Sequence, residues 1–189
     1  MTGPEASPER DLDLIVRVAQ GDEAAFDELV HKYQRSVINT VHRYVGEYDA
    51  ADDIAQEVFV IVWNKAGTFK GRSSFSTWLY RIVVNQCLQF RRRRQRRPAA
   101  VSIDGFDPDS PPEALQIAED LEQAERTAVA RRALSELPDR QRIALILSHY
   151  EERTYREIAD IMQTSVGSVE SLIFRAKEGL RSMLSREVR

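Results

Sequence analysis

Residues 155–175 read YREIADIMQTSVGSVESLIFR, and this stretch decides the fold of the C-terminal part of the chain. It fits two short helices separated by the turn Gln163-Thr164-Ser165. Apolar or small residues recur at three- and four-residue steps, as a buried helix face requires. These are Ile158, Ala159, Met162, Val169 and Leu172. The pattern predicts a helix-turn-helix, in which the small side chain of Ala159 allows the two helices to cross closely.

Capping signals delimit both helices. Thr154 stands three residues before Glu157, which is the spacing of a capping box. In that motif the hydroxyl and the carboxylate each satisfy a free backbone N–H group. Ser165 is placed to cap the second helix. Gln163 occupies a turn position where this motif usually has glycine, so we expect a strained or altered turn there.

The outward face of the second helix is polar, with small side chains near its N-terminus. Such a face suits close approach to phosphates and base edges in the major groove of DNA. A plain helical hairpin within some other bundle is the alternative interpretation of the same pattern. The residues expected to contact DNA are Tyr155, Arg156, Ser165, Gly167, Ser168, Glu170, Ser171 and Arg175.

A segment poor in core-forming residues precedes this motif. Residues 98–125 contain 8 acidic and no basic residues, and Pro98–Pro112 is rich in proline, aspartate, glycine and serine. We therefore expect a flexible acidic linker over 98–125, which joins domains at 10–97 and 126–189. The linker also explains the net charge of −3, because the rest of the chain carries 27 basic and 22 acidic residues.

The N-terminal domain is expected to be helical. Apolar residues recur at helical spacing in three stretches, Phe26–Tyr44, Ile54–Val62 and Phe75–Leu88, and no alternating strand pattern competes with them. Asp49 or Asp52 is expected to cap the second helix, which should end near Gly67. The predicted fold class is therefore all-α, with two small helical domains of which the second is a helix-turn-helix.

Aromatic and basic residues interleave from Phe69 to Arg81, across a short loop and the start of a helix. This mixture suits single-stranded DNA, because rings stack on unpaired bases, at about 1–3 kcal/mol per base, while cations hold the phosphates. The alternative is that the aromatic residues are core, and we expect Phe75, Leu79 and Trp78 to pack inward. The better contact candidates are Lys70, Arg72, Ser74, Ser76, Tyr80 and Arg81.

Six arginines follow within the seven residues 91–97. Neighbouring like charges repel unless an anion lies near them. A phosphate contact is therefore favoured over a solvated helix end.

Several classes of protein are excluded. Cys87 is the single cysteine, so neither an internal disulfide nor a cysteine-pair zinc site is possible, and the three histidines lack metal-ligand spacing. No phosphate-cradling glycine loop occurs, and the acidic group Asp52-Asp53-Glu57 has no partner cluster. We therefore expect no enzyme, no cofactor and no metal. With neither a membrane-spanning run nor a signal peptide, we expect a cytoplasmic location.

Three segments together resemble one known family. They are DDIAQEVF at 52–59, STWLYRI at 76–82 followed by Asn85, and the stretch 134–177 with Leu137-Pro138 and YREIA at 155–159. In this order and at these spacings they resemble the extracytoplasmic-function sigma factors of bacterial RNA polymerase. The resemblance covers about residues 11–184, and it implies a non-enzymatic subunit that brings polymerase to promoters and helps open the DNA.

The resemblance also implies residue roles. The helix-turn-helix face listed above would read the upstream promoter element. Acidic residues on one exposed helix face can pair with basic residues of a partner, although a charge cluster at a helix N-terminus is the alternative interpretation. The residues implied in binding core polymerase are Asp52, Asp53, Gln56, Glu57 and Phe59. Those implied in the downstream element and melting are Lys70, Arg72, Ser74, Ser76, Trp78, Tyr80, Arg81 and Asn85.

The chain departs from the family at Glu170 and Leu172, where many members carry basic residues. A glutamate can accept a hydrogen bond from a cytosine amino group but repels phosphate. We therefore expect this chain to read an upstream element that differs from the commonest one.

The implied partners are core RNA polymerase and promoter DNA, with a separate anti-sigma protein as a candidate regulator and no insertion into a membrane. A stand-alone helix-turn-helix transcriptional regulator is the alternative function. Such regulators are usually dimers on two half-sites, and no long heptad pattern for a dimerisation helix occurs in this sequence. That alternative would also leave the stretch around Trp78 without a use.

Overall fold

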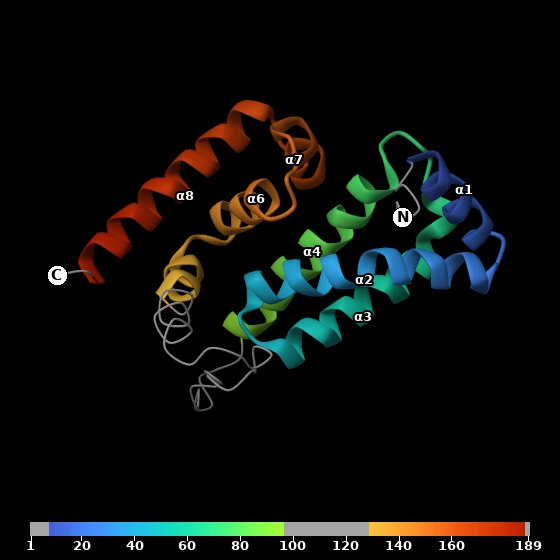
Figure 1. Ribbon diagram of the computed structural model, residues 1–189, viewed down its shortest axis with the longest axis horizontal. Helices are drawn as coiled ribbons and strands as arrows, with labels where there is room; N and C mark the ends of the chain where they lie inside the picture. Colours follow the sequence, from blue (N-terminus) through green and yellow to red (C-terminus); the bar gives the residue numbers. More distant parts are fainter. Residues whose placement is uncertain (1–7, 97–128, 188–189) are drawn as a thin grey trace, which may run out of the picture.

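The computed structural model describes residues 8–96 and 129–187, which form helices joined by short loops (Figure 1). The helices are α1 (Pro8–Val18), α2 (Glu23–Val45), α3 (Tyr48–Lys65), the 3₁₀ helix η1 (Ala66–Thr68), α4 (Phe75–Arg96), α6 (Asp139–His149), α7 (Tyr155–Met162) and α8 (Val166–Glu187). A further helical segment at 129–136 precedes α6. No strand occurs in the described ranges, so the predicted all-α class is confirmed.

The helices form two groups. In the N-terminal bundle, α2, α3 and α4 pack along one another, and α1 contacts α2, α4 and η1 (Figure 1). In the C-terminal unit, α6, α7 and α8 pack together. The predicted linker at 98–125 lies outside the described residues. Within the described ranges, no helix combines the length and the apolar character that crossing a membrane demands.

Local sequence explains most helix ends. The Asp22 carboxylate caps α2 by accepting a hydrogen bond from the Ala25 N–H at 3.0 Å. The helix ends at Gly46, whose φ of 91° suits a residue without a side chain. The expected cap of α3 is wrong, because Asp49 and Asp52 both lie inside a helix that begins at Tyr48. The expected stop near Gly67 is confirmed by η1.

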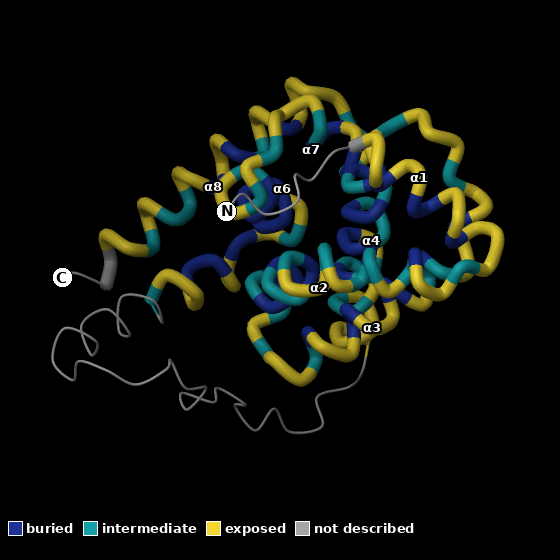
Figure 2. The backbone as a smooth tube through the Cα atoms, turned by 45° about the vertical axis from the view of Figure 1, so that its right-hand side comes forward, coloured by how far each residue is buried: buried dark blue, intermediate teal, exposed yellow. Residues whose placement is uncertain are grey.

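Every helix contributes buried apolar residues to the core, and buried positions appear as the dark segments of the backbone in Figure 2. In α2, α3 and α4 the fully buried ones recur at helical spacing, as the sequence predicts. Each buried leucine or valine contributes about 1.5–3 kcal/mol relative to an exposed one. The fully buried leucines and valines of these three helices are Leu29, Val37, Val41, Val58, Val62, Leu79 and Val83.

The predicted helix-turn-helix is formed by α7 and α8. The Thr154 hydroxyl accepts from the Glu157 N–H at 3.3 Å, and the Glu157 carboxylate accepts from the Thr154 N–H at 2.9 Å, which completes the capping box. The Ser168 N–H donates to the Ser165 hydroxyl at 3.2 Å, so Ser165 caps α8. Gln163 has a φ of 51°, which is the strained turn that the sequence predicts.

The C-terminal unit packs against the N-terminal bundle, with α7 on α4 and α6 on α2 (Figure 1). Arg142 on α6 is 1% exposed and connects the two groups. Its guanidinium donates to the carbonyls of Tyr44 at 3.0 Å and Leu137 at 3.1 Å, and also to that of Ser135. The guanidinium carbon lies 5.3 Å from the centre of the Tyr44 ring. A single buried cation therefore ties α6 to the end of α2 and to the end of the segment 129–136.

Candidate nucleic-acid and polymerase interfaces

The acidic residues of α3 form one exposed face. Asp52, Asp53, Gln56 and Glu57 are all exposed, and the Gln56 amide donates to the Asp52 carboxylate at 2.9 Å. Successive turns of α3 bring these side chains together, because residues three and four apart share a helix face. An open depression on this face is lined by Asp53, Gln56, Glu57, Val60 and Ile61.

Phe59 does not belong to that face. Its side chain is 9% exposed and lies in the core, so it offers little surface to a partner in this arrangement, and its implied role in polymerase binding stays a prediction. The apolar side chain that α3 exposes beside the acidic residues is Val60, which is 59% exposed. The two residues differ by one step of about 100° around the helix, so Phe59 continues the apolar stripe of the core while Val60 faces solvent.

The loop before α4 presents basic and polar side chains. Lys70, Arg72 and Ser74 are exposed, and Asn85 is exposed further along α4. The Ser74 hydroxyl accepts from the Thr77 N–H at 3.2 Å, so Ser74 also caps α4. The positive charges of this loop therefore stand free at the start of a well-capped helix.

Trp78 is half-buried in an aromatic cluster beneath the loop. Its ring centre lies 5.5 Å from that of Phe69 and 6.0 Å from that of Phe75. Phe75 and Leu79 are buried, as expected. The Trp78 side chain is therefore packed against Phe69 and Phe75, and the rest of its surface remains accessible to a ligand.

Tyr80 is not an exposed contact residue, which corrects the expectation from sequence. Its side chain is 0% exposed, and its hydroxyl lies 2.6 Å from the Ser36 hydroxyl and donates to the Glu151 carboxylate. Burial, together with the Glu151 charge, raises the pKa of Tyr80 to about 12. The correction has a physical reason: a loop of the C-terminal unit covers this part of α4.

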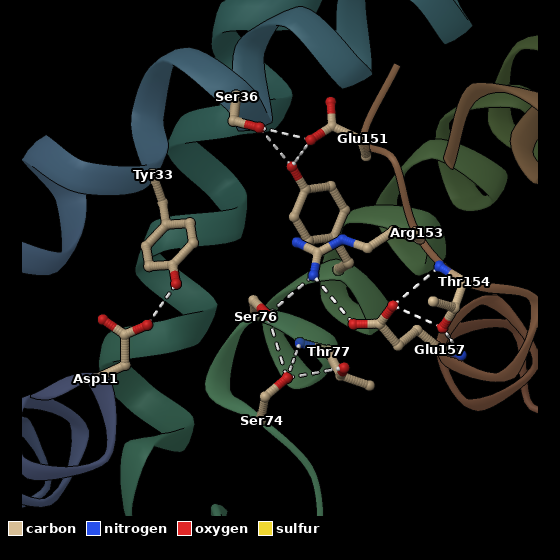
Figure 3. A network of polar contacts seen from close by, with 11 residues as sticks. Asp11, Tyr33, Ser36, Ser74, Ser76, Thr77, Glu151, Arg153, Thr154 and Glu157 are labelled. Carbon is tan, nitrogen blue, oxygen red and sulfur yellow. Dashed lines mark hydrogen bonds and ion pairs between the residues drawn. The ribbon is translucent and has the colours of Figure 1, made fainter. Parts of the chain in front are cut away.

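Ser76 and Arg81 are also engaged by the C-terminal unit. The Arg153 guanidinium donates to the Ser76 hydroxyl at 3.1 Å (Figure 3). The Arg81 guanidinium donates to the Asp160 carbonyl at 2.8 Å. Sequence reasoning missed Glu151 and Arg153, because a polar segment between two helices looks like an ordinary solvated turn.

The arginine cluster lies on the last turns of α4. Arg91 pairs with Asp139 at 3.3 Å, and Arg94 pairs with Glu47. The other described arginines of the cluster, Arg92, Arg93 and Arg96, are exposed, while Arg97 lies outside the described residues. Part of the cluster therefore has anionic partners within the protein, and part faces solvent.

The outward face of α8 stands free of the rest of the molecule. The eight residues expected to contact DNA, from Tyr155 to Arg175, are all exposed. Glu170, Ser171, Phe174 and Arg175 line one open depression. Phe174 is 67% exposed and was missed by sequence reasoning, although its spacing of four from Glu170 places it on this face.

Metal-ligating side chains are not clustered in residues 8–96 and 129–187. No group of three His, Cys, Asp or Glu side chains there is placed to hold a metal ion. The exposed faces of α3, of the loop before α4 and of α8 therefore carry charge and hydrogen-bonding groups suited to macromolecules.

Comparison with known proteins gives the family. The Sigma-70 region 2 family model matches residues 29–97, and the Sigma-70, region 4 model matches residues 127–180. The chain is 37% identical to the RNA polymerase sigma-H factor of Pseudomonas aeruginosa, over 93% of this chain and 94% of that protein. It is 35% identical to the ECF RNA polymerase sigma-E factor of Escherichia coli, over 93% of this chain and 95% of that protein. The chain belongs to the extracytoplasmic-function sigma factors.

Solved structures share the fold of this sigma factor. CnrH in complex with the cytosolic domain of CnrY matches with a TM-score of 0.70 at 24% identity, covering 94% of this chain and 98% of that chain. The sigma factor RpoE in complex with the anti-sigma factor NepR, from Bartonella quintana, matches with a TM-score of 0.63 at 23% identity, covering 85% and 96%. These likenesses support the all-helical architecture.

Family membership settles the general activity. The sigma factor binds core RNA polymerase, recognises promoter DNA and helps to melt it, and it is not an enzyme. The region 2 match accounts for the stretch around Trp78, which a stand-alone helix-turn-helix regulator would leave unused.

Proposed function

We propose that three separate faces divide the work of initiation in this sigma factor. The exposed face of α3, with Asp52, Asp53, Gln56 and Glu57, binds a basic surface of core polymerase, and Val60 supplies the apolar contact. Complementary charge on such a face steers association and fixes the orientation of the partners. Phe59 supports the face from within the core.

The loop before α4 engages the downstream promoter element and helps to keep it open. Lys70 and Arg72 hold phosphates of the separated strand, and the accessible part of Trp78 stacks against a base. One stacked base contributes about 1–3 kcal/mol, which offsets the few kcal/mol that unstacking a base costs. The observation that carries this proposal is the exposed basic loop directly above a half-buried aromatic cluster.

The outward face of α8 reads the upstream element. Gly167 and Ser168 lie at the N-terminus of α8, where small side chains allow close approach to the DNA. Glu170 is exposed in the depression that it shares with Arg175. We infer that Glu170 accepts a hydrogen bond from a cytosine amino group, and that Arg175 contacts a guanine edge or a phosphate.

The division at 10–97, 98–125 and 126–189 is compatible with binding both elements at once. Two sites separated by two helical turns of DNA lie about 70 Å apart. A chain as long as residues 98–125 reaches at most about 100 Å when fully extended. Its acidic composition keeps the linker from adhering to DNA.

We further propose a cytoplasmic location, where core polymerase and promoters are found, and control by a separate anti-sigma protein. The fold neighbours CnrH and RpoE are each described in complex with a second protein, CnrY or the anti-sigma factor NepR. The shared architecture supports a similar mode of control for this chain.

Abortive transcription with purified core polymerase on a pool of random promoters tests the proposed function. Initiation should require the sigma factor and should enrich a two-part promoter sequence with a C·G pair in the upstream part. Glu170→Gln should weaken the preference for that pair, while Glu178→Gln, outside the depression on the same helix, should leave it unchanged. Binding of promoter duplex without polymerase, and no initiation with it, would instead favour a stand-alone regulator.

A further inference from the structure

The arginine cluster at the end of α4 divides into two sets by helix face. Arg91 and Arg94 pair with carboxylates of the protein. Arg92, Arg93 and Arg96 are exposed. Residues four apart share a helix face, so Arg92 and Arg96 project together, with Arg93 beside them. The ion pairs within the described residues therefore engage the arginines that point elsewhere, and the face with Arg92, Arg93 and Arg96 is left for a ligand.

The free arginines continue the face of α4 that carries Trp78 and Asn85. Trp78 and Arg96 are about five full turns apart at 3.6 residues per turn, so they project from the same side of the helix. Asn85, Gln89 and Arg92 lie between them on that side, and all three are exposed. The helix runs the length of the bundle, from the loop beside α1 to the turn between α2 and α3 (Figure 1). One face therefore joins the residues assigned to the melted element to the free arginines.

The chemistry of this face changes along the helix. At its start the Trp78 ring stands in a cluster with Phe69 and Phe75, which suits stacking on unpaired bases. At its end the exposed side chains are amides and guanidinium groups, and the aromatic ring of Phe90 is half-buried. Such polar and cationic groups make the phosphate contacts that position a protein on duplex DNA. The arginine end therefore fits the backbone of a duplex better than an unpaired strand.

We propose that Arg92, Arg93 and Arg96 bind backbone phosphates of double-stranded DNA, in the base pairs that lie between the two promoter elements. The inference rests on the proposed binding of the downstream element by the loop before α4. Trp78 and Arg96 are about 27 Å apart along the helix, at 1.5 Å per residue. Phosphates of one DNA strand follow one another at about 3.4 Å. The contacts therefore fall at most about eight base pairs from the base that stacks on Trp78.

The order of the chain places these phosphates on the upstream side of the melted element. Residues 98–125 follow the arginines in the sequence and lead to the unit whose helix α8 is proposed to read the upstream element. The start of α4 then lies at the melted element, and its end lies toward the DNA between the two elements. Arginines that hold phosphates there fix the duplex at the edge of the melted region, so strand separation begins at a defined position.

The salt dependence of promoter binding by the holoenzyme counts these contacts. Each phosphate that a protein neutralises on duplex DNA adds about 0.9 to the slope of log affinity against log salt concentration. The triple variant Arg92→Gln, Arg93→Gln, Arg96→Gln should therefore lower this slope by about two to three. At physiological salt it should bind the selected promoter at least about tenfold more weakly. An unchanged slope would overturn the proposal.

A matched control removes the same charge from other exposed positions. Arg35→Gln, Lys65→Gln, Arg140→Gln changes one residue on each of α2, α3 and α6 and should leave the slope and the affinity as they were. Circular dichroism and thermal unfolding check the fold of both triple variants, because cations near the end of a helix also stabilise that helix. A loss of stability in the arginine variant with unchanged DNA binding would show that the arginines serve only the end of α4, and would overturn the proposal.

Neutral phosphates locate the contacts on the DNA. Methylphosphonates replace successive duplex phosphates upstream of the downstream element in the selected promoter. One window, within about eight base pairs, should weaken binding of the unaltered holoenzyme about fivefold. The same window should change binding of the arginine variant by less than about twofold, since the partners of those phosphates are already absent. Equal sensitivity of the two holoenzymes, or no sensitive window, would contradict a duplex contact by these arginines.

Two other occupants of the arginine face predict different results. If the face binds the acidic residues 98–125, the arginine variant should bind the promoter as tightly as the unaltered holoenzyme or more tightly. If it binds core polymerase, affinity for the core should fall in proportion to promoter binding. Either result would overturn the proposal. Initiation by the unaltered sigma factor is scored first, and its failure would count against the proposed function. A sigma factor that initiates but shows no sensitive window would count only against the duplex contact.

Discussion

The first turns of α4 and of α8 carry the two proposed DNA surfaces, and they differ in how freely they stand. The face of α8 with Glu170, Ser171 and Arg175 is exposed along its length. The corresponding part of α4 is covered where Tyr80 meets Glu151 and Ser76 meets Arg153. One proposed DNA surface therefore stands free in this structure, while part of the other is covered by the C-terminal unit.

Arg142→Met should have the largest effect, because it removes the buried cation that joins the two groups. The carbonyls of Tyr44, Ser135 and Leu137 would lose a charged donor, and breaking such a buried interaction costs about 3 kcal/mol. We expect a loss of that size in the free energy of unfolding of the C-terminal unit, measured by urea denaturation. Arg140→Met, at the neighbouring exposed position, should change it by less than about 0.5 kcal/mol. Equal effects would show that Arg142 does not connect the groups.

Trp78→Ala should come next and should affect promoter opening more than polymerase binding. Truncation of a half-buried tryptophan costs about 2–3 kcal/mol of stability, somewhat less than at a fully buried site. Permanganate footprinting should show at least tenfold less open complex, at a polymerase affinity within about twofold of the original, since about 1.4 kcal/mol is a factor of ten.

A second tryptophan provides the control for this prediction. Trp63→Ala removes a half-buried ring on a different part of the bundle. The centre of that ring lies 5.1 Å from the centre of the Phe26 ring. This substitution should lower stability by a similar amount and spare promoter opening. If both variants lose opening equally, Trp78 acts only through the fold.

Arg175→Ala should weaken promoter use through the free face of α8. Loss of one arginine contact to a base or phosphate costs about 1–3 kcal/mol. Binding of the holoenzyme to the selected promoter should fall accordingly in a filter-binding titration, while the affinity for core polymerase stays the same. Arg181→Ala, farther along α8 and paired with Glu178, is the matched control. A parallel loss of polymerase affinity would argue against a DNA role for Arg175.

Thr154→Ala should have a smaller effect, confined to α7. Loss of the capping hydroxyl costs about 1 kcal/mol, which thermal unfolding can detect. Ser165→Ala tests the cap of α8 in the same way. An unchanged unfolding temperature in both variants would show that neither cap stabilises the helix-turn-helix.

The capping box also predicts a small dependence on pH. Hydrogen bonds from Thr154 hold the pKa of Glu157 below its ordinary value of 4.5. The resulting stabilisation is fully present above about pH 4.5 and is lost as the pH falls through the lower pKa of the folded state. Thermal unfolding measured between about pH 6 and pH 3 should show this loss of stability. The loss should be smaller in Glu157→Gln. An identical pH profile in the variant would exclude Glu157 as its source.

The sequence predicts the helices, their periodic burial, the capping box and the exposed face of α8, because each depends on residues within a few positions of one another. The contacts that it does not predict have a different origin. Tyr80 and Ser76 are covered by residues more than 70 positions away, and no local pattern announces such a contact. Phe59 and Val60 are both apolar, and only the packed bundle shows that Val60 faces solvent while Phe59 is buried.

Photocrosslinking from one position on each DNA surface tests the division of roles most directly. A photoreactive side chain replaces Asn85 on α4 or Ser171 on α8, both exposed in this structure. With core polymerase present, each should crosslink to promoter DNA, at two sites separated by about two helical turns, or about 70 Å. Crosslinks from both positions to a single element, or full crosslinking from either position without polymerase, would contradict this division.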